Sequence, residues 1–258
     1  MTLHIQRVPV WQDNYAWILS APDGTAALVD APDAAPILAI LAERGLRLTH
    51  ILNTHHHFDH VGSNEALLAA FPDLQVFGGV YDQEHARIPG QTRALRDGER
   101  FAWGGVGCTV AEVPGHTLGH IAYLFDDGSA FVGDTLFVAG CGRLFEGTAE
   151  QLDRAINEVF DQLPPDTRLY CAHEYTASNL AFARSVDPDN GDLAAYAEQV
   201  AALRAEGQAT VPSTVALERR INPFVRADRA ELRAAAGCGP TAPRHEVVGA
   251  LRRMKDSF

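Results

Sequence analysis

Short apolar or alternating runs recur along roughly the first two thirds of the chain and predict β-strands. The turn signal at residues 22–24 and the run Asp126-Asp127-Gly128 each lie between two such runs and predict hairpins. The glycine-rich segment 104–107 also lies between two predicted strands, which favours a hairpin turn over a phosphate-binding loop. The predicted strands cover residues 3–8, 15–19, 27–30, 48–53, 75–77, 101–103, 108–113, 121–125, 130–132 and 168–171.

Helical spacing of apolar residues interrupts this pattern and then replaces it. Helices are predicted over 34–44, ending at Gly45, over about 63–71, and from a capping box at Thr148 to about Leu163. From residue 177 onward no convincing strand is found, and the predicted helices cover 177–185, 193–206, 227–236 and 245–257. We therefore predict an α/β domain over residues 1–172 and a smaller helical domain over residues 173–258.

One segment, from Thr54 to His60, holds four histidines and a carboxylate within seven residues. It lies between a predicted strand and a predicted helix, where α/β folds place their ligands. An extended backbone turns His55 and His57 to the same side. Asp59 and the histidine after it can reach the same point only if the chain turns. The pattern favours two neighbouring metal ions over a polar loop of solvated histidines.

Three more segments carry metal-binding residue types directly after a predicted strand, at His116, Asp134 and His173. Taken alone, each is more typical of an ordinary polar residue or turn. Because strand ends of one layered sheet converge on one edge, the four segments together predict a shared metal site.

Composition narrows the functional classes. The chain of 258 residues is 47% hydrophobic, enough for a sizeable core. A net charge of −12 disfavours a nucleic-acid partner. We also expect no membrane span, because no apolar run approaches the ~18 residues required. No secretory signal is visible, so we expect a cytoplasmic protein, and a monomer. The four cysteines form no Cys-x-x-Cys pair, which predicts reduced thiols rather than a cysteine-based zinc site.

The histidine motifs resemble those of the metallo-β-lactamase superfamily. They read Thr-His-x-His-x-Asp-His, Gly-His-Thr-x-Gly-His, Gly-Asp-Thr and a late histidine. The resemblance implies an α/β fold, a four-layered αββα sandwich with a two-metal site at one edge. Residues 140–148, 171–176, 222–224 and 251–258 are similar more narrowly to the glyoxalase II (hydroxyacylglutathione hydrolase) family, so the likeness covers essentially the whole chain.

This resemblance implies a set of ligands that binds two divalent metal ions per chain. The expected metal is zinc, and iron or manganese are alternatives. The bridging ligand would be Asp134. The resemblance implies no metal-binding role for His56 or His120, and we expect both to make supporting contacts. The first metal would be bound by His55, His57 and His116, and the second by Asp59, His60 and His173.

The family activity implied is hydrolysis of S-D-lactoylglutathione, a small-molecule glutathione thioester, to glutathione and D-lactate. A hydroxide held between the metals would attack the thioester carbonyl, with Asp59 and Asp134 as the catalytic carboxylates. Phe145 stands where one form of the family has tyrosine, which removes one hydroxyl donor. The residues that match the family's glutathione contacts are Arg143, Tyr175, Arg252 and Lys255.

Other functions of the same motifs are less consistent with this sequence. A single-iron persulfide dioxygenase is the main alternative, but it leaves the helical C-terminal part without a use. His60 directly after Asp59 is the wrong pattern for a metal-dependent β-lactamase, and the acidic charge disfavours a ribonuclease. An electron-transfer diiron protein would have a carboxylate at His57. A non-catalytic metal-binding scaffold would not need complete ligand sets on open loops.

Overall fold

The computed structural model describes residues 2–258 and divides into two compact units. Unit 1 consists of Met1–Glu112 and Gly119–Gly133, and unit 2 consists of Val113–Leu118 and Asp134–Phe258. The domain boundary predicted at residue 172 is a different division of the chain and stays a prediction.

Unit 1 contains a six-stranded sheet in which the strands follow one another in chain order. Its first three strands are antiparallel neighbours, and the remaining three continue the sheet in parallel. The central strands are buried along most of their length, which explains their continuous apolar sequences. The strands are β1 (His4–Val10), β2 (Asn14–Ser20), β3 (Thr25–Val29), β4 (Arg47–Leu52), β5 (Gln75–Gly79) and β6 (Arg93–Leu95).

Four antiparallel strands of unit 1 pack against the inner face of this sheet. Tyr123 donates a 2.9 Å hydrogen bond to the Asn53 carbonyl, and the rings of Phe77 and Phe101 meet edge to face at 5.5 Å. Gly104 and Gly105, both with positive φ, form the two-residue hairpin turn that the sequence predicts. The strands are β7 (Arg100–Trp103), β8 (Val106–Glu112), β9 (Ile121–Phe125) and β10 (Ser129–Gly133).

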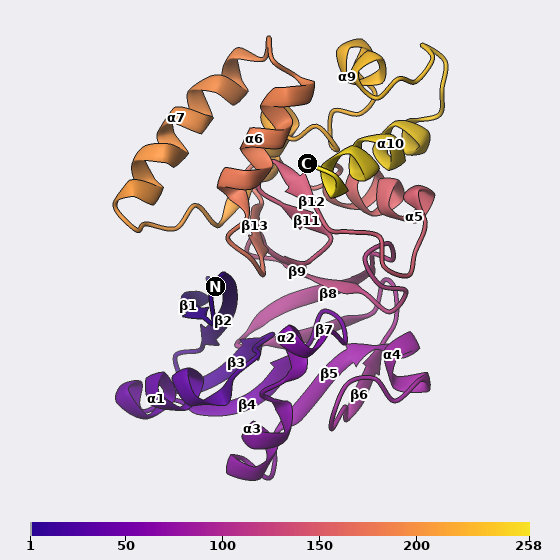
Figure 1. Cartoon of the computed structure of the whole chain (residues 1–258). Coiled ribbons are helices and arrows are strands. Elements are labelled where there is room, and N and C mark those ends of the chain that lie inside the picture. Colours follow the sequence, from indigo (N-terminus) through magenta and orange to yellow (C-terminus); the bar gives the residue numbers. More distant parts are fainter. Residues whose placement is uncertain (1) are drawn as a thin grey trace. The chain divides into compact units, whose positions relative to one another are not determined.

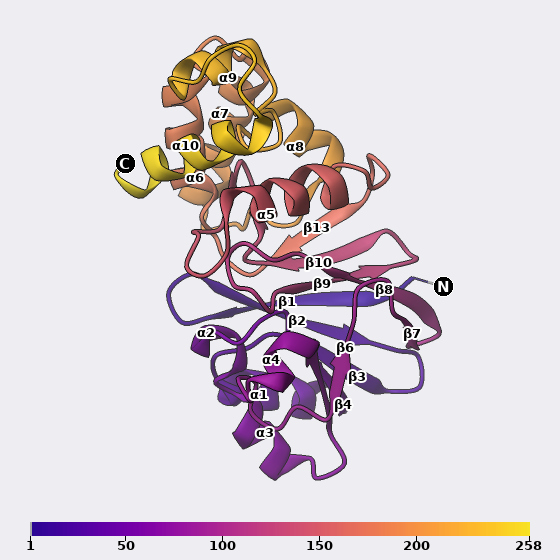
Figure 2. The same cartoon turned by 90° about the vertical axis from the view of Figure 1, so that its right-hand side faces the viewer.

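Helices of unit 1 cover the outer face of the six-stranded sheet (Figures 1 and 2). The first begins at the side-chain cap Asp33 and ends at the left-handed Gly45, as predicted. Its buried residues Ile37 and Leu41 join a core that includes Ile51 of β4. The helices are α1 (Ala34–Arg44), α2 (Phe58–Val61), α3 (Asn64–Ala70) and α4 (Val80–Glu84).

Unit 2 is mainly helical and carries two short strand pairs, β11 (Leu136–Phe137) with β12 (Gly140–Cys141) and β13 (Arg168–Cys171) with β14 (Ser213–Thr214). A Cβ at Gly249 of α10 would lie 2.9 Å from the Cβ of Ala149 in α5, so the close approach of these two helices depends on glycine. The helices are α5 (Ala149–Arg154), the π-helix η1 (Ala155–Phe160), α6 (Thr176–Val186), α7 (Gly191–Ala205), α8 (Val215–Ile221), α9 (Ala230–Ala235) and α10 (Arg244–Asp256).

Several elements differ from the sequence-based expectation. The strand at residues 168–171 is not the last, because β14 pairs with it, and the helix predicted to continue to Leu163 changes to a π-helix at Ala155. These features are short and depend on tertiary contacts, so their local pattern is weak. The sequence also missed α2, α4, α8, β6, β11 and β12.

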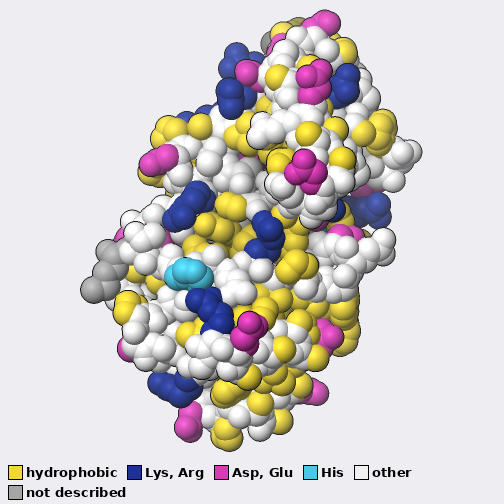
Figure 3. All heavy atoms as spheres, turned by 90° about the vertical axis from the view of Figure 1, so that its left-hand side faces the viewer, with side chains coloured by type: hydrophobic (Ala, Val, Ile, Leu, Met, Phe, Trp, Pro, Cys, Tyr) yellow, Lys and Arg dark blue, Asp and Glu magenta, His cyan; other side chains and the backbone are white. Residues whose placement is uncertain are grey.

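The distribution of charge on the surface and the length of the helices bear on whether the protein binds nucleic acid or crosses a membrane. On the face drawn in Figure 3, Lys and Arg side chains are interspersed with hydrophobic and acidic ones. Within residues 2–258, no helix combines the length and the hydrophobicity that a membrane crossing requires.

Candidate metal centre

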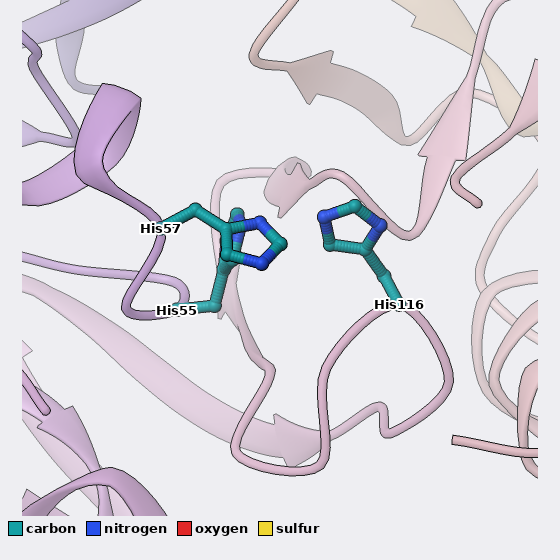
Figure 4. Close-up of side chains that lie close together, drawn as sticks. All are labelled: His55, His57 and His116. Carbon is teal, nitrogen blue, oxygen red and sulfur yellow. The ribbon is translucent and has the colours of Figure 1, made fainter. Parts of the chain in front are cut away.

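Unit 1 brings four of the predicted ligands together on one loop that follows β4. His55 Nε2 lies 3.1 Å from His57 Nδ1, and both side chains are drawn in Figure 4. The short helix α2 supplies the turn that the sequence requires, with the amide of His60 bonded to the His57 carbonyl at 2.9 Å. This turn places His60 Nε2 3.6 Å from Asp59 Oδ2. The loop therefore presents three imidazoles and one carboxylate.

Asp30, a residue that the sequence reasoning missed, orients two of these imidazoles. It is buried at the end of β3 and accepts hydrogen bonds from the Thr54 hydroxyl at 2.7 Å and from His60 Nδ1 at 2.9 Å. Since the Thr54 proton points to the carboxylate, the Thr54 oxygen accepts from His55 Nδ1 at 3.1 Å. Nδ1 of each ring is therefore engaged as a donor, which leaves Nε2 as the atom that would face a metal.

A second supporting residue, Asn14 at the start of β2, holds Asp59. Its amide nitrogen Nδ2 donates to Asp59 Oδ2 at 3.1 Å and also lies 3.5 Å from the Asp59 backbone carbonyl. Asn14 directly precedes a predicted strand and Asp30 ends another, so that Asp30, like Asp134, is an aspartate at the end of an apolar strand run. That repeated pattern is the signal that could have identified Asp30.

His56 and His120 support the loop from its other side. His56 Nδ1 lies 3.4 Å from Asp82 Oδ1, whose carboxylate is fully buried at the start of α4 and also lies 3.8 Å from Arg87. The His120 ring stacks on His55, with ring centroids 4.6 Å apart. Alternation along the extended loop thus separates His56, which faces Asp82, from its neighbours.

Unit 2 contributes three predicted ligands, each from a separate loop: His116 after β8, Asp134 after β10 and His173 after β13. All three are buried. His116 Nε2 and His173 Nε2 lie 3.6 and 3.4 Å from the same carboxylate oxygen, Asp134 Oδ2. His116 Nδ1 donates to the Arg143 carbonyl at 2.8 Å, which leaves its Nε2 lone pair facing the carboxylate.

The donor atoms fit divalent metals. In each unit an imidazole Nε2 atom lies 3.6 Å from a carboxylate oxygen, for His60 with Asp59 and for His116 with Asp134. Two acceptors in this arrangement attract a cation. All seven predicted ligands are among the residues that could hold a metal ion, and their imidazole and carboxylate groups suit zinc, iron or manganese.

The thiols of Cys141 and Cys171 do not belong to this donor set. Burial raises the pKa of Cys141 to about 11, and burial also raises the pKa of Cys171 above its ordinary value. Both thiols therefore stay protonated at neutral pH, whereas a metal ligand must be a thiolate.

Among the predicted glutathione contacts, Arg252 and Lys255 of α10 lie in different surroundings. Arg252 is only 3% exposed, and its guanidinium donates to the Cys141 carbonyl at 2.7 Å and to Asp256 at 3.2 Å. Lys255 lies over the Phe182 ring, and burial lowers the pKa of its amine to about 8. Arg252 thus supports the loop at Cys141, whereas Lys255 lies against an aromatic ring.

Arg143, Tyr175 and Phe145 complete the residues that the sequence singled out in unit 2. The Arg143 side chain is exposed and lies 3.5 Å from Asp256. Tyr175 stacks nearly parallel on the predicted ligand His173, with centroids 4.7 Å apart. Phe145 is exposed and meets the predicted ligand His116 edge to face at 5.2 Å. Two of the three therefore lie against a predicted metal ligand, and the role of each in binding substrate stays a prediction.

Comparisons with known proteins agree with the sequence motifs. Residues 10–173 match the metallo-β-lactamase superfamily, and residues 174–258 match the family described as hydroxyacylglutathione hydrolase C-terminus. The chain is 50% identical to a hydroxyacylglutathione hydrolase of Synechococcus sp. (strain JA-2-3B'a(2-13)), over 99% of this chain and 100% of that relative.

Solved structures confirm the fold class. ETHE1 from Myxococcus xanthus has a TM-score of 0.69 at 24% identity, over 97% of this chain and 91% of that one. TTHA1623 in a di-iron-bound form has a TM-score of 0.62 at 26% identity, over 85% of this chain and 99% of that one. The predicted metallo-β-lactamase fold with a helical C-terminal part is therefore confirmed. Given the full-length match at 50% identity, the chain belongs to the hydroxyacylglutathione hydrolase family, also called glyoxalase II, of the metallo-β-lactamase superfamily.

Proposed function

We propose that this protein hydrolyses S-D-lactoylglutathione to glutathione and D-lactate, and that the seven predicted ligands bind two divalent ions, with zinc as the first choice. The observation that carries the proposal is the matched geometry of the two ligand sets. Each presents an oriented imidazole nitrogen 3.6 Å from a carboxylate oxygen. The full-length similarity to named hydroxyacylglutathione hydrolases supports the choice of reaction.

The ligands divide as the family pattern implies. His55, His57 and His116 would bind one ion, and Asp134 would bridge to the ion bound by the other three ligands, Asp59, His60 and His173. The proximity of His116 and His173 to one Asp134 oxygen supports that bridging role, because each histidine belongs to a different ion's set. The similar structure that contains two irons supports a two-metal arrangement for this chain as well.

The residues of the chain would prepare the site for a thioester. When bound, two divalent ions would supply Lewis acidity and lower the pKa of a water molecule enough for attack on a carbonyl at neutral pH. Asn14 fixes the Asp59 carboxylate, which can then orient the attacking water through its second oxygen. The leaving group is a thiolate with a free pKa near 8.5, so no separate general acid is needed.

Recognition of glutathione would fall to cationic groups of unit 2. Glutathione is anionic and the chain carries a net charge of −12, so local positive groups are needed. Arg143 has an exposed guanidinium, and Lys255 keeps a positive charge below pH 8. Tyr175, stacked on His173, would add a hydroxyl beside the metal. Arg252 would act chiefly by holding the Cys141 loop in place.

The test combines elemental analysis with hydrolysis of S-D-lactoylglutathione, followed by the loss of thioester absorbance. We expect about two metal ions per chain, rapid hydrolysis, and loss of activity after chelation that returns when metal is restored. A metal-loaded protein that holds one iron per chain and does not hydrolyse the thioester would contradict the proposal and favour a persulfide dioxygenase. Asp126→Ala, which removes an exposed carboxylate paired with Arg100, is a matched control that should keep both metal and activity.

A further inference from the structure

Two large aromatic side chains lie exposed beside the metal ligands of unit 1. Trp11 is 55% exposed and Phe58 is 70% exposed, and their rings stack with centroids 5.9 Å apart at an interplanar angle of 28°. Phe58 stands between the ligands His57 and Asp59 in the sequence. Among residues 2–258, these two are the large hydrophobic side chains of unit 1 that are exposed. Exposed apolar surface concentrated next to a reactive centre is typical of a binding surface.

The backbone at Trp11 is strained in a way that displays the indole. Its φ of 54° lies in the left-handed region, which bulky residues seldom adopt. Glycine or asparagine would form this turn between β1 and β2 with less strain. Strained backbone positions cluster where side chains meet ligands. The turn therefore holds a large aromatic residue at a position that folding alone does not favour.

The turn is also connected directly to a metal ligand. Asn14, three residues after Trp11, donates to Asp59 Oδ2 at 3.1 Å. Phe58 immediately precedes Asp59 at the start of α2. Phe58 is thus linked to the Asp59 carboxylate through the backbone, and the turn that carries Trp11 is linked to it through the hydrogen bond from Asn14. We place this carboxylate at the reaction centre.

We propose that Trp11 and Phe58 form the acyl subsite, which receives the acyl group of the thioester and favours acyl groups that carry an aromatic ring. This inference rests on the proposed function and adds a class of substrate to it. A thioester has two arms that diverge from the carbonyl carbon. The glutathione arm is polar and anionic and suits Arg143 and Lys255 of unit 2. The acyl arm is short and uncharged and suits the exposed rings next to Asp59.

The size of the acyl group decides how much it gains from this surface. A lactoyl group presents one methyl group, which can cover little of two aromatic rings. A 2-hydroxyacyl group with a phenyl ring can stack on the pair and bury apolar surface on both sides. Because burying a phenyl ring on an aromatic pair is favourable, we expect the pair to raise kcat/KM for the phenyl-bearing substrate relative to the lactoyl substrate by about 10- to 50-fold.

The experiment compares S-D-lactoylglutathione with S-D-mandeloylglutathione in the metal-loaded protein. The variants are Trp11→Ala, Phe58→Ala, the double variant, and the conservative changes Trp11→Phe and Phe58→Leu. In the double variant we expect the mandeloyl-to-lactoyl ratio of kcat/KM to fall at least 10-fold, mainly through a higher KM for the mandeloyl substrate. The conservative variants should retain most of the wild-type ratio, and all variants should keep the wild-type metal content.

Each other outcome overturns the inference. An unchanged ratio means that the rings do not contact the acyl group. An equal loss for both substrates, with reduced metal content, means that the pair supports the ligand loop. Trp11→Ala separates these cases even if Phe58→Ala disturbs α2, because Trp11 is not adjacent to a ligand in the sequence. Failure of the wild type to hydrolyse either thioester would instead refute the proposed function, and the acyl subsite with it.

Discussion

The two sets of candidate metal ligands are oriented by different means. In unit 1, four predicted ligands lie on one loop and the short helix α2 that follows it, and the side chains of Asp30 and Asn14 orient three of them: His55, Asp59 and His60. In unit 2, three ligands come from three loops, and the Arg143 backbone carbonyl orients His116. A set oriented by side chains can be disturbed by one conservative substitution. A set oriented by the backbone depends on whatever holds that loop in place.

The largest effect should follow from removing Asp134, the ligand that we propose to bridge both ions. Asp134→Ala deletes the carboxylate that lies near both His116 and His173, so we expect weaker binding of both ions and a loss of activity well above the ~10- to 100-fold typical of an orienting partner. Metal content and kcat/KM measured beside Asp126→Ala would check this. His120→Ala, which removes a stacking partner of His55, should cost less. Near-normal metal content in Asp134→Ala would rule out a bridging role.

The side-chain orientation of unit 1 can be tested at Asp30. In Asp30→Asn, the amide group competes for the position of the carboxylate oxygen that accepts from Thr54 and His60. We expect metal affinity or activity to fall by about 10- to 100-fold, while the fold is retained. Titration with zinc and thermal unfolding of the apo-protein give the two readouts. Unchanged zinc affinity would show that the loop backbone alone orients these histidines.

The backbone orientation of unit 2 can be tested on α10, where two cations three residues apart act differently. Arg252 bonds the Cys141 carbonyl close to Arg143, so Arg252→Ala should lower stability and activity toward every thioester. Lys255→Ala should instead raise KM for the glutathione thioester by about 10- to 150-fold, the loss of a charged hydrogen bond worth about 1.5–3 kcal/mol. A small thioester without glutathione, assayed in both variants, distinguishes the two. Equal losses on both substrates in Lys255→Ala would refute its role in recognition.

The same lysine predicts a dependence on pH. Burial is the main cause that lowers its pKa from 10.5 to about 8, so the amine is charged below pH 8 and loses its charge as the pH rises through that value. KM for the anionic substrate should therefore rise above about pH 8 in the wild type. In Lys255→Arg the charge persists, and the rise should be absent if the guanidinium takes the same place.

The smallest effect on activity is expected at Glu218 of α8, which supports the turn between β11 and β12. It is buried and accepts from the amide of Ala139, a residue with a φ of 55° in the turn between β11 and β12. Burial raises the pKa of its carboxyl from 4.5 to about 7. The folded state therefore holds this proton more tightly than the unfolded state, and stability falls as the pH rises from about 4.5 to 7.

Glu218→Gln should remove that dependence, because an amide does not ionise and can still accept from the Ala139 amide. By the pKa shift, the variant should gain up to ~3 kcal/mol relative to the wild type between pH 4.5 and pH 7. Urea unfolding of both proteins across this pH range measures the difference. Parallel stability curves for the two proteins would show that Glu218 does not titrate in this window.

Features encoded by neighbouring residues could be predicted from the sequence alone. The cap Asp33 and the terminator Gly45 bound α1, Thr148 begins α5 with a capping box, and Gly104-Gly105 closes a hairpin, all as predicted. The predicted ligands of the unit 1 loop also lie within a segment of six residues, from His55 to His60. Alternation along the strand and the need for a turn follow from backbone geometry, which acts over a few residues.

Tertiary structure decided which residues support these local features. Asp30 and His60 are thirty positions apart, and no periodicity links them. Arg252 and Lys255 share a helix face, yet burial makes one a support for the backbone and lowers the pKa of the other. The strand β14 exists because two residues pair with β13. Local patterns set backbone conformation, whereas burial and long-range hydrogen bonds depend on how distant segments pack.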